Sequence, residues 1–225
     1  MPVVLLIRHA QATYGGAAAL SELGLRQAAL LDEALARRDA PAGRIAVGTL
    51  PRQTDTARAC TQSITSAPLV DARWDEYAAV DVLAHHGSIT PGSGPRNSLG
   101  APSSLSARDF QILLDQALAA WIEAGERSPC DENWPAFARR VLAALSDLAA
   151  PLASGGQAWA FTSGGVIAAI GAALLGAPPA TFIALNRVSV NSGVTTIITG
   201  RGGPRLLTFN DHSHLEQDRA LVTFR

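Results

Sequence analysis

Residues 3–10 read VVLLIRHA, an unbroken apolar run that ends at an arginine and a histidine. A short, β-branched apolar run is typical of a strand that is buried on both faces of a parallel sheet. Arg8 and His9 both carry side chains that bind anions, and they follow the last apolar residue directly. In open α/β sheets, ligands bind beyond the carboxyl ends of the strands. The stretch therefore predicts a buried strand that carries Arg8 and His9 to a phosphate-binding site.

Two further apolar runs end in polar residues in the same way. RIAVG at 44–48 leads into a segment that ends at Arg52, and AWAFT at 158–162 leads into Ser163 and two glycines. The carboxyl ends of neighbouring parallel strands lie at one edge of a sheet, where ligands bind. We therefore expect the three strand ends to line one crevice.

Strands and helices alternate along the rest of the chain. Helices are expected at 22–38, 52–66, 106–125, 134–150 and 164–175, and extended segments at 70–74, 188–199 and 205–209. This alternation predicts an α/β fold, a three-layer α/β/α sandwich with a mostly parallel central sheet. We expect a single domain over residues 1–225, with a helical insertion at about 104–153 and a long loop rich in Gly, Pro and Ser at 87–107.

Composition excludes several classes of partner. The 225 residues include 18 basic and 19 acidic side chains, so no positive field is available to hold nucleic acid or a membrane surface. The uncharged region 158–186 is broken by glycines and prolines, which argues against a membrane span. Two cysteines without a CxxC pair, and no signal-peptide pattern, indicate a cytoplasmic protein with reduced thiols.

Five stretches, in order along the chain, resemble motifs of the histidine phosphatase superfamily, the phosphoglycerate mutase-like family. LIRHAQAT at 6–13 is similar to the family's Arg-His-Gly signature, with Ala10 in the place of the glycine. The other four are LSELGLRQA at 20–28, GTLPRQTDTA at 48–57, DENWPAFARRV at 131–141 and FNDHSHL at 209–215. The resemblance implies a phosphoglycerate mutase-like fold and a phosphomonoester hydrolase that needs no metal or cofactor and acts on a small phosphorylated substrate.

The resemblance also implies a nucleophile and its phosphate ligands. His9 would attack phosphorus as a neutral imidazole and form a phosphohistidine. Arg8 and Arg52 would hold the phosphate oxygens, because a guanidinium group matches phosphate geometry and keeps its charge. Their positive charge would also keep His9 neutral.

A general acid must protonate the leaving alcohol, and RWDEY at 73–77 offers two carboxyl groups, Asp75 and Glu76. The family places a glutamate in a comparable position after the third extended segment, so the resemblance favours Glu76 as the acid. Gln11 and Thr13 are expected to contact phosphate oxygens.

FTSGG at 161–165 departs from the family's pattern, in which a histidine at this place hydrogen-bonds the transferring phosphate. Ser163 stands in the histidine place, and its hydroxyl can donate one hydrogen bond but carries no charge. With Gly164 it begins a predicted helix, whose N-terminus favours an anion. Phosphate binding is therefore expected to survive better than turnover. Three further histidines are candidates to replace the missing one from loops, namely His85, His86 and His212.

Other functions stand beside the hydrolase. A phosphate-ligand binding or regulatory protein of the same fold would keep the site and lose most turnover through Ser163. A phosphoglycerate mutase-type phosphotransferase is disfavoured, because no extra basic cluster indicates a bisphosphate site. A serine hydrolase would need a glycine where Phe161 stands, and a metal hydrolase would need an HExxH motif or a carboxylate cluster, which the sequence lacks. The sequence leaves a homodimer open.

Overall fold

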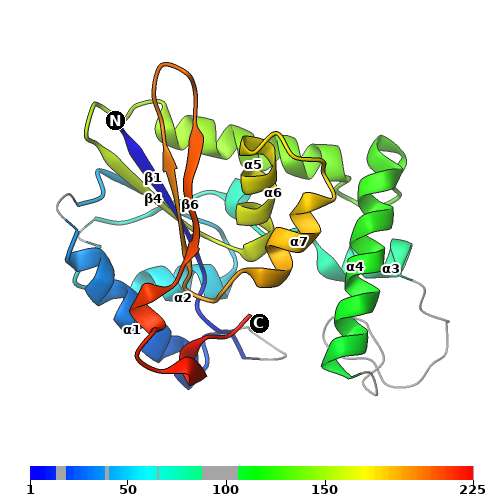
Figure 1. Ribbon diagram of the computed structural model, residues 1–225, viewed down its shortest axis with the longest axis horizontal. Coiled ribbons are helices and arrows are strands. Elements are labelled where there is room, and N and C mark those ends of the chain that lie inside the picture. The colour runs from blue at the N-terminus through cyan, green and yellow to red at the C-terminus, as the bar shows by residue number, and fades with distance from the viewer. Residues whose placement is uncertain (14–18, 39–40, 65, 88–105, 225) are drawn as a thin grey trace. The chain divides into compact units, whose positions relative to one another are not determined.

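The computed structural model describes residues 1–13, 19–38, 41–64, 66–87 and 106–224, which form two compact units. The first unit consists of Met1–Thr13, Ala17–Glu76 and Val141–Arg225, and the second is built on Tyr77–Arg140. Figure 1 follows the chain from β1 in blue to the C-terminal segment in red. Among the helices described, none combines the length and the apolar character that crossing a membrane requires.

Within the described residues, the first unit holds a sheet of six strands in the order β3-β2-β4-β1-β5-β6. Strands β3, β2, β4 and β1 are parallel, and β5 and β6 are antiparallel along one edge. The predicted α/β fold with a mostly parallel central sheet is confirmed. The strands are β1 (Val3–Arg8), β2 (Arg44–Val47), β3 (Leu69–Val70), β4 (Gln157–Thr162), β5 (Val194–Ile198) and β6 (Arg205–Asp211).

Helices cover both faces of this sheet (Figure 1). Helices α1 (Glu22–Ala36) and α2 (Pro51–Ala59) pack against one face, and α6 (Gly164–Leu174) contacts β1 and β6 from the other. Because both faces are enclosed, the central strands are continuous apolar runs. The strand residues buried beneath α1 and α2 are Leu5, Ile7, Ile45, Val47, Trp159 and Phe161.

Helix α2 ends at Ala59, well short of the end predicted at residue 66. The carboxylate of Asp32, on α1, accepts hydrogen bonds from the backbone amides of Gln62 and Ser63, both at 2.9 Å. A side chain that binds backbone amides competes with the helical hydrogen bonds of those amides. The tertiary contact with α1 therefore ends the helix, although the sequence pattern continues.

The strand predicted at 188–199 begins only at Val194. Helix α7 (Thr181–Val188), which the sequence analysis did not predict, precedes a loop in which Ser192 has a left-handed φ of 60°. The amide of Ser192 donates to the carbonyl oxygen of His9 at 3.2 Å. The loop is therefore shaped by its contact with the end of β1, which the alternation of residue types does not reveal.

The extended segments predicted at 70–74 and 205–209 also differ from the strands in their bounds. The extended segment predicted at 70–74 is shorter, because β3 is followed by a 3₁₀ turn at Ala72–Trp74 that the Asp71 side chain caps. Strand β6 pairs with β5 in antiparallel orientation, and the Gly202-Gly203-Pro204 turn lies between them.

The second unit is helical and contains α3 (Ala79–His86), which was not predicted, and α4 (Ala107–Ala124). Helix α5 (Trp134–Ala149) begins in this unit and passes into the first at Val141, so the unit differs at both ends from the insertion predicted at about 104–153. The loop predicted at 87–107 lies almost entirely outside the described residues. Four aromatic rings with centroids 5.5–6.0 Å apart form the centre of the unit, namely Tyr77, Trp121, Trp134 and Phe137.

A glycine on α1 sets how closely this helix approaches the segment after β1. A β carbon at Gly24 would lie 2.1 Å from the backbone oxygen of Gln11. We expect Gly24→Ala to destabilise the protein by about 1–3 kcal/mol despite the better helix propensity of alanine, because backbone cannot make room for the methyl group. Gly43→Ala is the control, since its β carbon would meet the nearest atom at an ordinary 3.6 Å. Chemical denaturation measures both variants, and equal stabilities would contradict the prediction.

Candidate functional site

The backbone of His9 is held by three neighbouring segments of the first unit. His9 follows the last residue of β1, and its amide donates to the carbonyl oxygen of Thr162, at the end of β4, at 2.8 Å. Its own carbonyl oxygen accepts from the Ser192 amide and from Asn191 Nδ2, both at 3.2 Å. These bonds fix where the imidazole leaves the chain, independently of the ring's own contacts.

The ring of His9 is buried and makes two polar contacts. Arg52 Nε donates to His9 Nε2 at 3.0 Å, and His9 Nδ1 lies 2.8 Å from the carbonyl oxygen of Ala10. A guanidinium N–H can only donate, so Nε2 accepts and the ring proton resides on Nδ1. Burial lowers the pKa of His9 well below its ordinary value, and the charges of Arg8 and Arg52 lower it further. The ring is therefore neutral, with the lone pair of Nε2 directed at a guanidinium group.

Helix α2 supplies Arg52 and ties itself to the loop that carries His9. The helix begins at Pro51, whose fixed φ suits a first helical position, and Arg52 is the next residue. One turn later, the hydroxyl of Thr56 accepts a hydrogen bond from the Ala10 amide at 2.9 Å. Positions 52 and 56 are four apart and lie on one side of the helix. The same side of α2 therefore contacts both the backbone and the ring of the His9 segment.

Arg8 lies between the C-terminal segments and the start of α6. Its guanidinium group donates to the carbonyl oxygens of Ser189 and Phe224. A β carbon at Gly164 would lie 3.3 Å from Arg8 Nε and 2.9 Å from Asn186 Oδ1, so the glycine lets Arg8 approach the first turn of α6. Two fixed positive features, the guanidinium group and the helix N-terminus, consequently stand side by side.

Ser163 is fully buried at the start of α6. Gln53 Nε2 donates to its hydroxyl oxygen at 2.9 Å and to the carbonyl oxygen of Trp74 at 3.0 Å. Gln53 directly follows Arg52 in the chain, so α2 contacts the ends of both β1 and β4. The Ser163 side chain is thus part of a neutral hydrogen-bonded group and brings no charge to the site.

The two candidate acids occupy different places. Glu76 accepts a hydrogen bond from the Gly165 amide at 2.9 Å, which puts its carboxyl group at the N-terminus of α6. Asp75 accepts from the Thr49 amide at 2.6 Å and from the Thr49 hydroxyl, which ties the loop after β2 to the segment after β3. The geometry therefore gives Asp75 a bracing role and leaves Glu76 as the carboxyl group beside Ser163 and Gly164.

A sequence model of the histidine phosphatase superfamily, branch 1, matches residues 4–86 and 99–212. The chain belongs to this superfamily. No curated protein is similar enough in sequence to be matched. Among solved structures, mycobacterial glucosyl-3-phosphoglycerate phosphatase is similar at 24% identity, with 92% of this chain and 98% of that chain covered and a TM-score of 0.65. A phosphoserine phosphatase mutant from Entamoeba histolytica is similar at 17% identity, with 96% of this chain and 100% of that chain covered and a TM-score of 0.66. The α-ribazole phosphatase from Shigella flexneri is similar at 19% identity, with 93% of this chain and 96% of that chain covered and a TM-score of 0.62, and identities this low bear on the fold alone.

Gln11 and Thr13, two of the predicted phosphate ligands, make hydrogen bonds with the residues just before α1. The side-chain oxygen of Gln11 accepts from the Ser21 hydroxyl at 2.8 Å, and the Thr13 hydroxyl donates to the carbonyl oxygen of Ala19 at 3.1 Å. Both bonds connect the segment after β1 to the residues just before α1. The structure therefore places Gln11 and Thr13 in the entry to α1, with bonds that shape this segment.

The structure also locates the three histidines that were considered as replacements for the histidine missing at position 163. His85 and His86 lie on α3 in the second unit, where His86 Nε2 is 2.8 Å from the Ser128 hydroxyl. His212 Nδ1 is 2.7 Å from the carbonyl oxygen of Asn210. These bonds connect His86 and His212 to residues of their own surroundings, and neither bond is to Ser163.

Sequence reasoning missed several residues that position this site. Gln53 and Thr56 carried a usable signal, because they lie one and four residues after Arg52 on a predicted helix. Asn191 and Ser192 carried none, because they lay inside a predicted strand. The contact of Ser192 Oγ with His214 Nε2, at 2.9 Å, was equally hidden.

Burial makes His214 a source of pH dependence. Its pKa is lowered to about 4, first by burial and then by His212, while Asp211 opposes the shift. In the unfolded chain its pKa would be about 6.5, so between these values the unfolded state binds the additional proton.

We expect the free energy of unfolding to fall as the pH decreases from about 6.5 to about 4, by about 2–3 kcal/mol from this group, with His9 contributing in the same direction. His214→Gln removes the group and should flatten the profile, which denaturation at a series of pH values measures. Parallel profiles for the wild type and the variant would refute the assignment.

Proposed function

We propose that the protein is a phosphomonoester hydrolase that acts through a phosphohistidine on His9. The observation that carries the proposal is the state of the ring, a buried neutral imidazole whose Nε2 lone pair meets Arg52 Nε at 3.0 Å. A nucleophilic imidazole must be unprotonated, and a phosphate ligand is bound well by a guanidinium group. Family membership supports the same chemistry.

When substrate binds, phosphate oxygens would replace His9 Nε2 as the hydrogen-bond partner of Arg52. The guanidinium group would release Nε2 and donate to phosphate oxygens, which puts phosphorus in line with the lone pair that Arg52 had held. Arg8 and the N-terminus of α6 would add positive potential from the other side. The Nδ1–H group would keep donating to the Ala10 carbonyl oxygen and so keep the ring from rotating.

The reaction then needs two steps. In the first, Nε2 bonds to phosphorus, the ester P–O bond breaks, and the leaving oxygen takes a proton from Glu76, which releases the alcohol. In the second, water attacks phosphorus while the Glu76 carboxylate takes its proton, the P–N bond breaks, and inorganic phosphate leaves. Glu76 is suited to this because the Gly165 amide fixes one of its oxygens.

A small phosphorylated substrate is in keeping with the similar structures, whose names describe phosphatases for glucosyl-3-phosphoglycerate and phosphoserine. We expect the protein to act in the cytoplasm without metal or cofactor.

A second candidate function follows from the buried Ser163. If this serine replaces a histidine, the site has lost a charged donor to the transferring phosphate, and the Gln53 bond holds the hydroxyl in a neutral group. The protein would then bind a phosphate ligand in a regulatory role with little turnover. The charges that attract phosphate, Arg8 and Arg52, are the same in both functions.

Replacement of the nucleophile separates these functions. We expect the wild type to hydrolyse an aryl phosphate and His9→Ala to lose at least about 10³-fold in kcat, because no other group can form the intermediate. His86→Ala, a histidine of the second unit, is the matched control and should retain full activity.

A phosphoenzyme from labelled substrate, stable to alkali and labile to acid, should appear in the wild type and be absent in His9→Ala. Equal hydrolysis by both proteins would overturn the mechanism. Phosphate binding without hydrolysis by either would favour the regulatory function.

The role of Ser163 is tested by restoring a histidine. Because Gln53 occupies the space next to the hydroxyl, the histidine needs room, so we expect Ser163→His combined with Gln53→Ala to raise kcat by about tenfold or more. Gln53→Ala alone is the control for the lost amide. Hydrolysis kinetics and circular dichroism of the three proteins measure the effect. A folded double variant that is no faster than Gln53→Ala would show that the site works with serine.

A further inference from the structure

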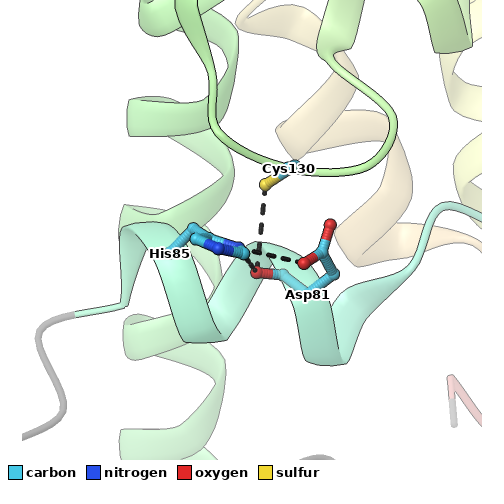
Figure 2. Close-up of side chains that lie close together, drawn as sticks. All are labelled: Asp81, His85 and Cys130. Atoms are coloured by element: carbon cyan, nitrogen blue, oxygen red, sulfur yellow. Dashed lines mark hydrogen bonds and ion pairs between the residues drawn. The ribbon is translucent and has the colours of Figure 1, made fainter.

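Three side chains of different chemistry meet in the second unit, whereas His9 belongs to the first. Asp81 and His85 lie four residues apart on α3, and Cys130 comes from the segment before α5 (Figure 2). One carboxylate oxygen, one imidazole nitrogen and the thiol sulfur all lie within 4.8 Å of one another. Oxygen, nitrogen and sulfur donors gathered in this way are a set that borderline-soft divalent ions accept.

The separations suit a single small ion. His85 Nδ1 lies 2.9 Å from Asp81 Oδ1, and Cys130 Sγ lies 3.8 Å from the backbone oxygen of Asp81. In a tetrahedral zinc site with bonds of about 2.0–2.3 Å, the donor atoms are about 3.3–3.6 Å apart. The carboxylate and the imidazole would therefore move slightly apart, and the sulfur, which lies within 4.8 Å of both donor atoms, would move closer to enclose an ion.

Neighbouring backbone groups hold two of the donors in place. The Asp131 amide donates to Asp81 Oδ2 at 2.9 Å, which turns Oδ1 toward His85. The Cys130 amide donates to the Ser128 hydroxyl at 3.3 Å. Outer contacts of this kind orient the ligands of metal sites.

Exposure provides a way in for the ion. Cys130 is buried, whereas the side chain of Asp81 is 20% exposed and that of His85 is 42% exposed. The cluster thus has a buried sulfur at its base and an open imidazole at its rim, so a fourth position is accessible to water.

We propose that Asp81, His85 and Cys130 form a binding site for a divalent transition metal ion, with Zn²⁺ as the best match. The aspartate and the cysteine thiolate balance the two positive charges, and the neutral His85 binds through Nδ1. The thiol proton passes to solvent when the sulfur binds the ion. Sulfur and imidazole ligands select Zn²⁺ over Mg²⁺ and Ca²⁺, which take oxygen ligands.

The bound ion would join α3 to the segment that leads into α5. An ion pair between Asp81 and His85, four residues apart, would by itself explain two of the three side chains. Without an ion, the Cys130 thiol donates to the backbone oxygen of Asp81 at 3.8 Å, so a bound ion would replace the thiol hydrogen bond as well as the ion pair. The site is independent of the proposed hydrolase, because none of its residues belongs to the His9 cluster.

Titration of the full-length, reduced protein with Zn²⁺ tests the proposal. Calorimetry should show one ion bound per chain, and Co²⁺ in its place should give the absorption of a sulfur-to-cobalt charge transfer. We expect Cys130→Ser and His85→Ala each to weaken Zn²⁺ binding at least about tenfold and Cys130→Ser to abolish the charge-transfer band. Mg²⁺ should not compete.

Cys60→Ser is the matched control, since Cys60 is the other buried thiol and lies in the first unit. It should bind Zn²⁺ as the wild type does. Circular dichroism without metal establishes that each variant folds, and Asp81→Asn gives a second test that leaves side-chain volume unchanged. Absence of stoichiometric binding by the wild type, or equal binding by wild type, Cys130→Ser and Asp81→Asn, would overturn the proposal.

Discussion

The hydrogen bond from Arg52 Nε to His9 Nε2 is the interaction on which the rest of the site depends. It requires a neutral ring, because a protonated Nε2 would present a second donor to the guanidinium group. Burial and the charges of Arg8 and Arg52 supply that condition by lowering the pKa of His9. The same charges that keep the ring neutral are those that attract a phosphate. In the proposed reaction, one arrangement would thus prepare the nucleophile and the phosphate site together, without a separate base to remove a proton.

This arrangement constrains the backbone of the first unit. The His9 peptide is bonded to the end of β4 and to the loop before β5, so the ring position is set by the register of three adjacent strands. Helix α2 must then begin where its second residue reaches the ring. Pro51 begins the helix at that point, and the hydrogen bond from the Ala10 amide to Thr56 holds the helix against the His9 segment. The proposed phosphate chemistry would therefore use the most buried elements of the fold, and rigid elements hold reacting groups more firmly than loops do.

The sequence predicted those features that local residue patterns determine. Buried strands followed by Arg8, Arg52 and Ser163 gave the mostly parallel sheet and the edge at which the site lies, because strand burial and strand ends are local properties. The end of α2 was missed because it depends on Asp32, a residue of another helix. The loop around Ser192 was missed because its conformation depends on a hydrogen bond to the carbonyl group of His9. Contacts between segments distant in sequence decide both, and periodicity does not report such contacts.

The neutral group of Ser163 and Gln53 affects the proposed hydrolysis differently from the arginines. A phosphate dianion in the ground state would be held by the charges of Arg8 and Arg52, which no part of the serine pair alters. As the phosphoryl group moves to His9, charge spreads over its equatorial oxygens, and a donor aimed at them matters more than before. An uncharged hydroxyl stabilises this charge only weakly, so the serine would slow the transfer step rather than weaken phosphate binding. Affinity for phosphate and the speed of its transfer would thus be set by different side chains of one site.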